Sequence, residues 1–176
     1  SDVYKRQGNR QFENTDSLFL KKRRVIDKGN TEVVAEYIKE MTGADVFRIM
    51  PDKEYEKIQD YDELVELTRI EHENDERPTF NGKINDIGKY DTIFIGSPIW
   101  WYTFPQVMYT FLDSYDLNGK TIIPFTTHEG SGLADVVEVL RKYYPNATVA
   151  EGLAIRGRDA VKSKEKVVRW LEKTGF

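Results

Sequence analysis

Three loops in this chain carry residue types that could bind a ligand, and the first lies just ahead of a helix. The stretch "DKGNTE" (residues 27–32) places Gly29, Asn30, Thr31 and Glu32 where an amphipathic pattern begins. Backbone amides at a helix N-terminus, helped by the helix dipole and a hydroxyl group, bind anions such as phosphate. A plain N-cap formed by Asn30 or Thr31 is the simpler alternative for these residues.

The second loop, "GSPIWWYTFPQ" (residues 96–106), directly follows the apolar run "DTIFI". Neighbouring residues after a strand point to opposite sides, so we expect one tryptophan to pack in the core and the other to face outward. An outward indole beside Tyr102 would form a flat apolar wall for a planar ring. Core packing of both tryptophans is the alternative interpretation.

The third loop, "FTTHEGSG" (residues 125–132), combines glycines with threonine, histidine and serine. The glycines let backbone amides approach a ligand closely, and the hydroxyl and imidazole groups supply polar contacts. The alternative is a glycine-rich connection in which Ser131 caps the next helix.

Hydrophobic periodicity predicts alternating helices and strands that would position these loops. Expected helices are residues 31–42, 60–76, 105–114, 132–145 and 161–173, and expected strands are residues 44–50, 91–97, 118–127 and 147–155. This alternation favours an α/β fold, a doubly wound parallel sheet with helices on both faces. Ligands of such sheets bind outside the carboxyl ends of the strands, where all three loops are expected.

Composition narrows the classes of function. The net charge is −4 with both signs mixed along the chain, so we expect no nucleic-acid partner. The chain has no cysteine and only two histidines, far apart in sequence, so we expect no metal site. No apolar stretch reaches the roughly 20 residues that span a bilayer, and no signal-peptide pattern opens the chain. We therefore expect a cytoplasmic protein without membrane contact.

Together, one loop suited to phosphate and two suited to a planar heteroaromatic ring predict a flavin mononucleotide (FMN) site. The stretches "DTIFIGSPIWWYTFP", "LNGKTIIPFTTHEGSG", "PNATVAEGLAIRG" and "GNTEVVAEYI" resemble the flavodoxin-like family, in particular flavodoxins of anaerobic Firmicutes with a long insert before Gly-Asn-Thr. The resemblance covers residues 29 to about 172. It implies the strand order 2-1-3-4-5 of that fold.

The resemblance also implies which residues bind FMN. The phosphate loop would comprise Gly29, Asn30, Thr31 and Glu32. The isoalloxazine ring would lie beside Pro98, Ile99, Trp100, Trp101 and Tyr102, with Trp101 or Tyr102 rather than Trp100 stacking on it. The other flavin loop would comprise Thr127, His128, Glu129, Gly130, Ser131 and Gly132. No residue is expected to be catalytic in the bond-making sense.

The chain departs from the family at its start. The family begins with a buried strand, central in the sheet, that typically ends in Ser-Arg near the phosphate, and no convincing counterpart precedes Gly29. The first seven residues, "SDVYKRQ", resemble translated sequencing-adaptor sequence and are excluded from the fold prediction. We therefore expect residues 1–28 to be an irregular or artefactual segment and residues 29–176 to form the FMN-binding domain. Either the sequence lacks the first strand or something else fills its place.

The predicted function is electron transfer by noncovalently bound FMN, in a monomer or homodimer. The expected partner is a redox protein or a small-molecule electron donor or acceptor. An NAD(P)H-dependent FMN or quinone reductase is the first alternative, so whether the protein is an enzyme stays open. A flavin-free interaction domain on the same scaffold is the second, because a fold alone does not determine function.

Overall fold

The computed structural model describes residues 28–176, and the predictions for residues 1–27 lie outside this part of the chain. The larger elements are α2 (Asn30–Thr42), α3 (Tyr61–Glu73), β3 (Thr92–Pro98), α4 (Gln106–Ser114), β4 (Thr121–His128), α5 (Val136–Tyr143), β6 (Leu153–Arg156) and α6 (Lys164–Thr174). The short ones are β1 (Met50–Pro51), η1 (Tyr55–Lys57), β2 (Phe80–Asn81), η2 (Ile87–Lys89), β5 (Thr148–Val149) and η3 (Gly157–Lys162).

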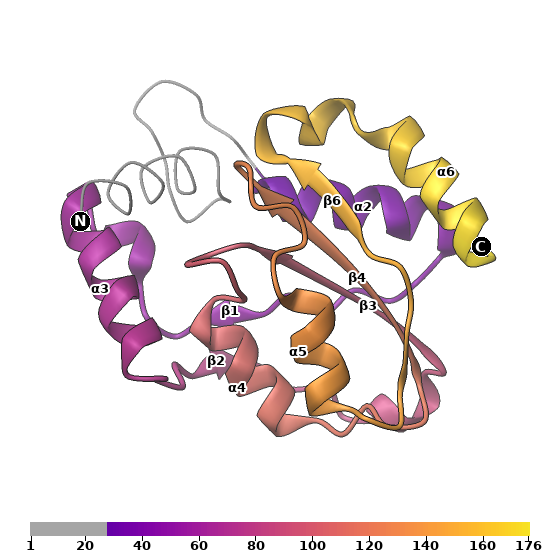
Figure 1. The fold of residues 1–176 in the computed structure, drawn as a ribbon, viewed down its shortest axis with the longest axis horizontal. Coiled ribbons are helices and arrows are strands. Elements are labelled where there is room, and N and C mark those ends of the chain that lie inside the picture. Colours follow the sequence, from indigo (N-terminus) through magenta and orange to yellow (C-terminus); the bar gives the residue numbers. More distant parts are fainter. Residues whose placement is uncertain (1–27) are drawn as a thin grey trace.

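A parallel sheet lies at the centre of the fold, with β4 between β3 on one side and β5 and β6 on the other. Helices α2 and α6 cover one face, and α4 and α5 cover the other (Figure 1). Residues 122–127 of β4 are all buried, as expected for a strand covered on both faces. The predicted α/β class with helices on both faces is confirmed.

The predicted strand over residues 44–50 is wrong for most of its length. Only Met50 pairs, together with Pro51, and it pairs antiparallel to β2 rather than within the parallel sheet. Phe47 and Ile49 still pack against the apolar cluster under α4. The apolar pattern therefore predicted burial correctly, but residues 44–49 have no neighbouring strand among the described residues. The short strand β2 was not predicted.

The predicted strand over residues 147–155 is divided into β5 and β6, and Pro124 of β4 provides the physical reason. The Ile122 carbonyl accepts a hydrogen bond from the Ala150 amide, 2.9 Å. The backbone N–H and C=O positions of residues 122 and 124 therefore point toward β5 and β6. Proline has no N–H to donate there. Three residues, 150–152, lie between the paired positions Val149 and Leu153, opposite two in β4. This extra residue is a bulge.

Most other predicted boundaries hold within a few residues, with differences at two helices. Helix α3 ends at Glu73, a few residues before the predicted end, and Asp60 caps its start by accepting bonds from the amides of Asp62 and Glu63. Helix α5 begins at Val136 because residues 132–135 form turns. No helix within residues 28–176 is long and apolar enough to cross a membrane.

Helix α3 lies to one side of the sheet and is held by buried polar contacts (Figure 1). Its Glu71 carboxylate is 2% exposed and accepts hydrogen bonds from the Tyr55 hydroxyl, 3.0 Å to each oxygen. Lys53 forms an ion pair with the same carboxylate. Burial, together with the Glu71 charge, raises the pKa of Tyr55, so its hydroxyl stays a donor. Glu71 is therefore paired inside the protein.

We predict that Gly96→Ala destabilises the protein by about 1–3 kcal/mol, the usual range for overpacking a core. A Cβ at this position of β3 would lie 2.0 Å from Cζ of the buried Phe125 ring. Gly130→Ala is the matched control, because a Cβ there meets nothing within 4 Å. Chemical denaturation of both variants measures the difference. Equal stability of the two would contradict this account of the packing.

Candidate functional site

The second and third loops begin side by side at the carboxyl edge of the sheet. Pro98 of β3 lies in register with Thr127 of β4. The ladder continues one step into the loop, where the Ile99 amide donates to the Thr127 carbonyl, 3.1 Å. The parallel pairing therefore brings residues 98–102 and 127–132 to the same edge, as predicted for a ligand site.

The N-terminus of α2 reaches the same edge. The hydroxyl oxygens of Thr31 and Thr127 lie 2.7 Å apart, which joins the first loop to the third. Gly29 occupies the N-cap position in an extended conformation, and it has no side chain with which to cap the helix. The alternative in which Asn30 or Thr31 is a plain N-cap is therefore wrong.

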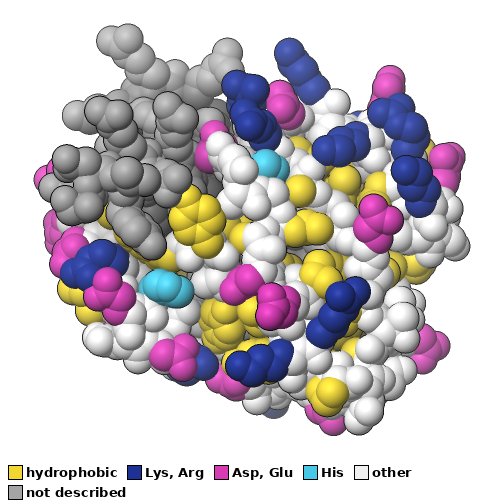
Figure 2. Space-filling view, in the orientation of Figure 1, with side chains coloured by type: hydrophobic (Ala, Val, Ile, Leu, Met, Phe, Trp, Pro, Cys, Tyr) yellow, Lys and Arg dark blue, Asp and Glu magenta, His cyan; other side chains and the backbone are white. Residues whose placement is uncertain are grey.

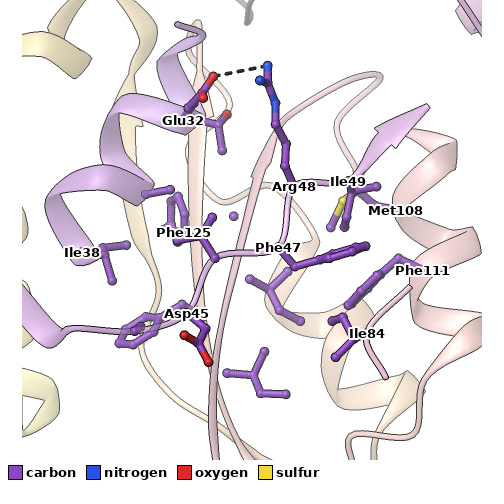
Figure 3. Close-up of a pocket in the computed structure, with 18 of the residues that line it drawn as sticks. Glu32, Ile38, Asp45, Phe47, Arg48, Ile49, Ile84, Met108, Phe111 and Phe125 are labelled. Atoms are coloured by element: carbon purple, nitrogen blue, oxygen red, sulfur yellow. Dashed lines mark ion pairs between the residues drawn. The ribbon is translucent and has the colours of Figure 1, made fainter. Parts of the chain in front are cut away.

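Glu32 differs from the other residues of the first loop in the direction of its side chain. Its carboxylate pairs with Arg48 Nη2 at 3.3 Å. Figure 3 shows this pair at one end of an apolar cavity that lies beside β3. The ion pair thus links the first turn of α2 to residues 44–49.

The aromatic loop is a two-residue hairpin turn. Trp100 and Thr103 exchange both backbone hydrogen bonds, each 3.0 Å, with Trp101 and Tyr102 at the turn. Both turn residues have positive φ, 53° and 63°, the signs of a type I′ turn. Such positions favour Asn and Gly, and each non-glycine residue in the left-handed region costs roughly 1–2 kcal/mol. The turn is therefore strained.

The three aromatic side chains of this loop have different environments. Trp100 is buried and packs edge-on against Tyr55, with ring centroids 6.0 Å apart. Trp101 is half-buried, and its indole N–H donates to Thr68 Oγ1 of α3, 3.2 Å. Tyr102 is 41% exposed. The expectation that one tryptophan packs in the core is confirmed for Trp100, and the neighbouring Ile99 is also buried in the core.

The third loop combines one internal hydrogen bond with two buried polar atoms that have no partner among the described residues. Thr126 Oγ1 donates to the Gly132 carbonyl, 2.9 Å, which closes the loop on itself. Within residues 28–176, His128 Nδ1 and Ser131 Oγ are buried and make no hydrogen bond. Because α5 begins at Val136, the alternative in which Ser131 caps this helix is wrong. Buried polar atoms without partners cost free energy, so this loop is suited to a polar ligand.

His128 lies in an environment that disfavours its charged form. Burial lowers the pKa of its imidazole, and the positive charges of Arg156 and Lys166 lower it further. Arg156 lies beside His128 because the two residues are in register on β4 and β6. At neutral pH the imidazole is therefore uncharged.

Two contacts that position the site were not predicted from the sequence. Thr68, which holds the Trp101 indole, is distant in sequence and sits in a charged helix, so no local signal identifies it. Thr103 contacts the Tyr109 hydroxyl at 2.6 Å and fixes the far end of the aromatic turn. No local signal reveals the hairpin, because its turn residues, Trp101 and Tyr102, are not the Asn and Gly that such turns favour.

The fold and this edge define the class of the protein: a doubly wound α/β protein whose candidate site lies at the carboxyl ends of its strands. A family model described as Flavodoxin matches residues 25–174, and the chain belongs to this family. No curated protein matches the chain.

Solved structures resemble the chain over most of its length. A candidate flavoprotein from Bacteroides eggerthii is 31% identical with a TM-score of 0.70, and the match covers 81% of this chain and 89% of that chain. A second, from Bacteroides uniformis, is 30% identical with a TM-score of 0.70 over 81% and 90%. A Lactobacillus acidophilus flavoprotein in complex with FMN is 20% identical, with a TM-score of 0.56 over 75% and 89%, and shares the fold.

We predict that Tyr102→Gly is more stable than Tyr102→Ala by about 1 kcal/mol, because glycine adopts positive φ without a Cβ clash. Both variants lose the same aromatic ring, so their difference reports the backbone strain alone. Urea denaturation of the two ligand-free proteins measures it. A more stable alanine variant would show that the turn relaxes at no cost.

We predict that acidification destabilises the wild type more than His128→Gln. The native pKa of His128 is lowered, so the unfolded chain binds the proton more readily. The stabilising contribution is complete above the ordinary pKa of about 6.5 and is lost as the pH falls below it. Melting temperatures at about pH 7.5 and about pH 5.5 should show a wild-type advantage that shrinks on acidification. An unchanged difference would indicate an ordinary, solvated imidazole.

Proposed function

We propose that this protein binds FMN noncovalently and transfers electrons as a flavodoxin-type carrier. The observation that carries the proposal is the contact between Thr31 and Thr127, because it joins the helix terminus suited to phosphate to the loop suited to the flavin ring. Membership of the flavodoxin family and the FMN complex of the Lactobacillus acidophilus protein support the same cofactor.

The phosphate group of FMN would bind at the start of α2. Gly29 leaves the first-turn amides without a capping side chain, and the helix dipole favours an anion there. Thr31 adds a hydroxyl group to these amides. Glu32 is held by Arg48 and does not bring an unpaired negative charge toward the phosphate.

The ring of FMN would lie between the aromatic turn and the third loop. Tyr102 and the half-buried Trp101 supply apolar faces, and Trp101 is fixed by its bond to Thr68. His128 Nδ1 and Ser131 Oγ, which lack partners among the described residues, supply polar contacts for the ring edge. The bound cofactor supplies the redox chemistry, while these residues orient it and exclude water.

The alternative function is that of an enzyme, an NAD(P)H-dependent reductase. The exposure of Tyr102 is the observation that favours it. A reductase needs an open face over the ring for the nicotinamide. Rapid oxidation of NADPH by the FMN-loaded protein would identify a reductase, whereas a carrier would exchange electrons only with a partner. A colourless protein that does not take up FMN would instead indicate an interaction domain.

We propose a redox protein or a small-molecule donor or acceptor as the partner. Positive and negative side chains are interspersed on the face shown in Figure 2. A partner that docks on this face would therefore meet charges of both signs rather than a single-sign patch. Such docking would be only moderately sensitive to salt.

We predict that Thr31→Val weakens FMN binding about tenfold or more and leaves riboflavin binding nearly unchanged, because riboflavin lacks the phosphate. A hydrogen bond to a charged group contributes about 1.5–3 kcal/mol. Thr127→Val is the matched control, because it also removes the contact between the two hydroxyl groups but leaves the Thr31 hydroxyl in place. Quenching of flavin fluorescence on titration gives both affinities. Equal losses for both ligands would place the phosphate elsewhere, and a wild type that binds neither would refute the proposed function.

A further inference from the structure

The chain contains two Asn-Gly pairs, Asn81–Gly82 and Asn118–Gly119, whose residue types predict the same reactivity. The backbone nitrogen of a glycine can attack the side-chain amide of a preceding asparagine, because no Cβ obstructs the approach. Both glycines have positive φ, 84° for Gly82 and 78° for Gly119, so the two pairs share this backbone conformation as well. Their hydrogen bonds therefore decide which pair reacts.

The pair Asn118–Gly119 is closed by its hydrogen bonds. The Asn118 side chain donates through Nδ2 to Asp116 Oδ1, 2.8 Å, and accepts through Oδ1 from the Asn146 amide, 2.9 Å. The Gly119 N–H donates to the Asn146 carbonyl, 3.0 Å. Attack of this nitrogen on the side chain would break all three bonds. The fold therefore protects Asn118.

The pair Asn81–Gly82 lies at the end of the antiparallel stem formed by β1 and β2. Asn81 is exposed and pairs with Met50. The bond from the Asp52 amide to the Thr79 carbonyl, 2.9 Å, sets the alternation of this ladder, so the Gly82 N–H points away from β1. Within residues 28–176, neither the Asn81 side chain nor the Gly82 N–H makes a hydrogen bond. The attacking nitrogen and the amide that it attacks are therefore both available.

We propose that Asn81 is a site of spontaneous covalent modification, in which its side-chain amide becomes a carboxylate. The Gly82 nitrogen loses its proton and forms a bond to Asn81 Cγ, and the bond from Cγ to Nδ2 breaks to release ammonia. Water then opens the resulting cyclic imide at either of its two carbonyl carbons. One product is aspartate, and the other is isoaspartate, in which the main chain passes through the side-chain carbon. Nothing is oxidised or reduced, and water is the co-reactant.

The isoaspartate product affects the segment that carries α3. Its main chain is one carbon longer at residue 81, so the register between Asn81 and Met50 cannot be kept. The stem of β1 and β2 closes the segment of residues 52–79, in which Thr68 bonds to the Trp101 indole. Isoaspartate therefore loosens the base of this segment, whereas aspartate keeps the main chain and adds only a charge.

The test is incubation of the ligand-free full chain in mildly alkaline buffer, followed by peptide mapping with mass spectrometry. We expect Asn81 to convert progressively into two separable products and Asn118 to stay unchanged. Asn81→Gln is the matched control, because its longer side chain does not close the same ring. Conversion of Asn118 as fast as Asn81, or of neither residue, would overturn the proposal.

The same incubation in concentrated urea separates the effect of the fold from that of the sequence. Both Asn-Gly pairs should then convert at similar rates, because the bonds that protect Asn118 are lost. A persistent difference in urea would show that the neighbouring residues, rather than the hydrogen bonds, protect Asn118, and would contradict the structural argument.

Amide hydrogen exchange tests the consequence for the stem. The Met50 amide lies in a hydrogen-bonded pair with residue 81, so it should lose protection in the isoaspartate fraction and keep it in Asn81→Asp. Equal protection in these two proteins would contradict the effect on the stem. FMN is absent from every arm, so failure to bind FMN would refute the proposed function alone.

Discussion

The parallel ladder between β3 and β4 is the interaction on which the rest of this structure depends. It pairs each residue from Thr92 to Pro98 with a partner from Thr121 to Thr127, and β4 is buried between two helical layers. Because parallel strands end at the same edge, the ladder alone places the aromatic turn beside the glycine-containing loop. Helix α2 then reaches that edge through the contact between Thr31 and Thr127. The candidate site is thus a consequence of strand register rather than of any one motif.

Much of this arrangement was predictable because the signals are local. The apolar run "DTIFI" and the glycine after Thr42 identify β3 and the end of α2, and both were predicted within one residue. The predictions that were wrong concern features set by contacts between segments that are distant in sequence. The apolar pattern of residues 44–50 indicated burial, but a strand also needs a neighbour, and pairing cannot be seen in the pattern itself. Pro124 was visible in the sequence, yet its effect falls on residues 150–152, which it meets only in the folded sheet.

The candidate site was also predictable only in its local features. The three loops were identified from their composition, and the structure brings Thr31, Pro98 and Thr127 to one edge. The roles of individual residues within each loop were harder to predict from the sequence. Two adjacent aromatic residues at positive φ are rare, so the residues "WWYT" do not predict a turn. The turn is identified only by the hydrogen bonds between Trp100 and Thr103. Strain at such positions persists only where the surroundings hold it, here through Thr68 and Tyr109.

The attachment of α3 has a consequence for ligand binding. This helix is anchored through the buried Glu71 to Tyr55 and Lys53, and its Thr68 holds the Trp101 indole. Segments joined by a few polar contacts can open without global unfolding. Opening of α3 would release Trp101, so a ligand that rests on this indole selects the docked helix. Linkage is reciprocal: the factor by which such a ligand stabilises the docked state is the factor by which docking tightens the ligand. Docking of α3 would therefore tighten ligand binding at a site whose walls this helix does not form.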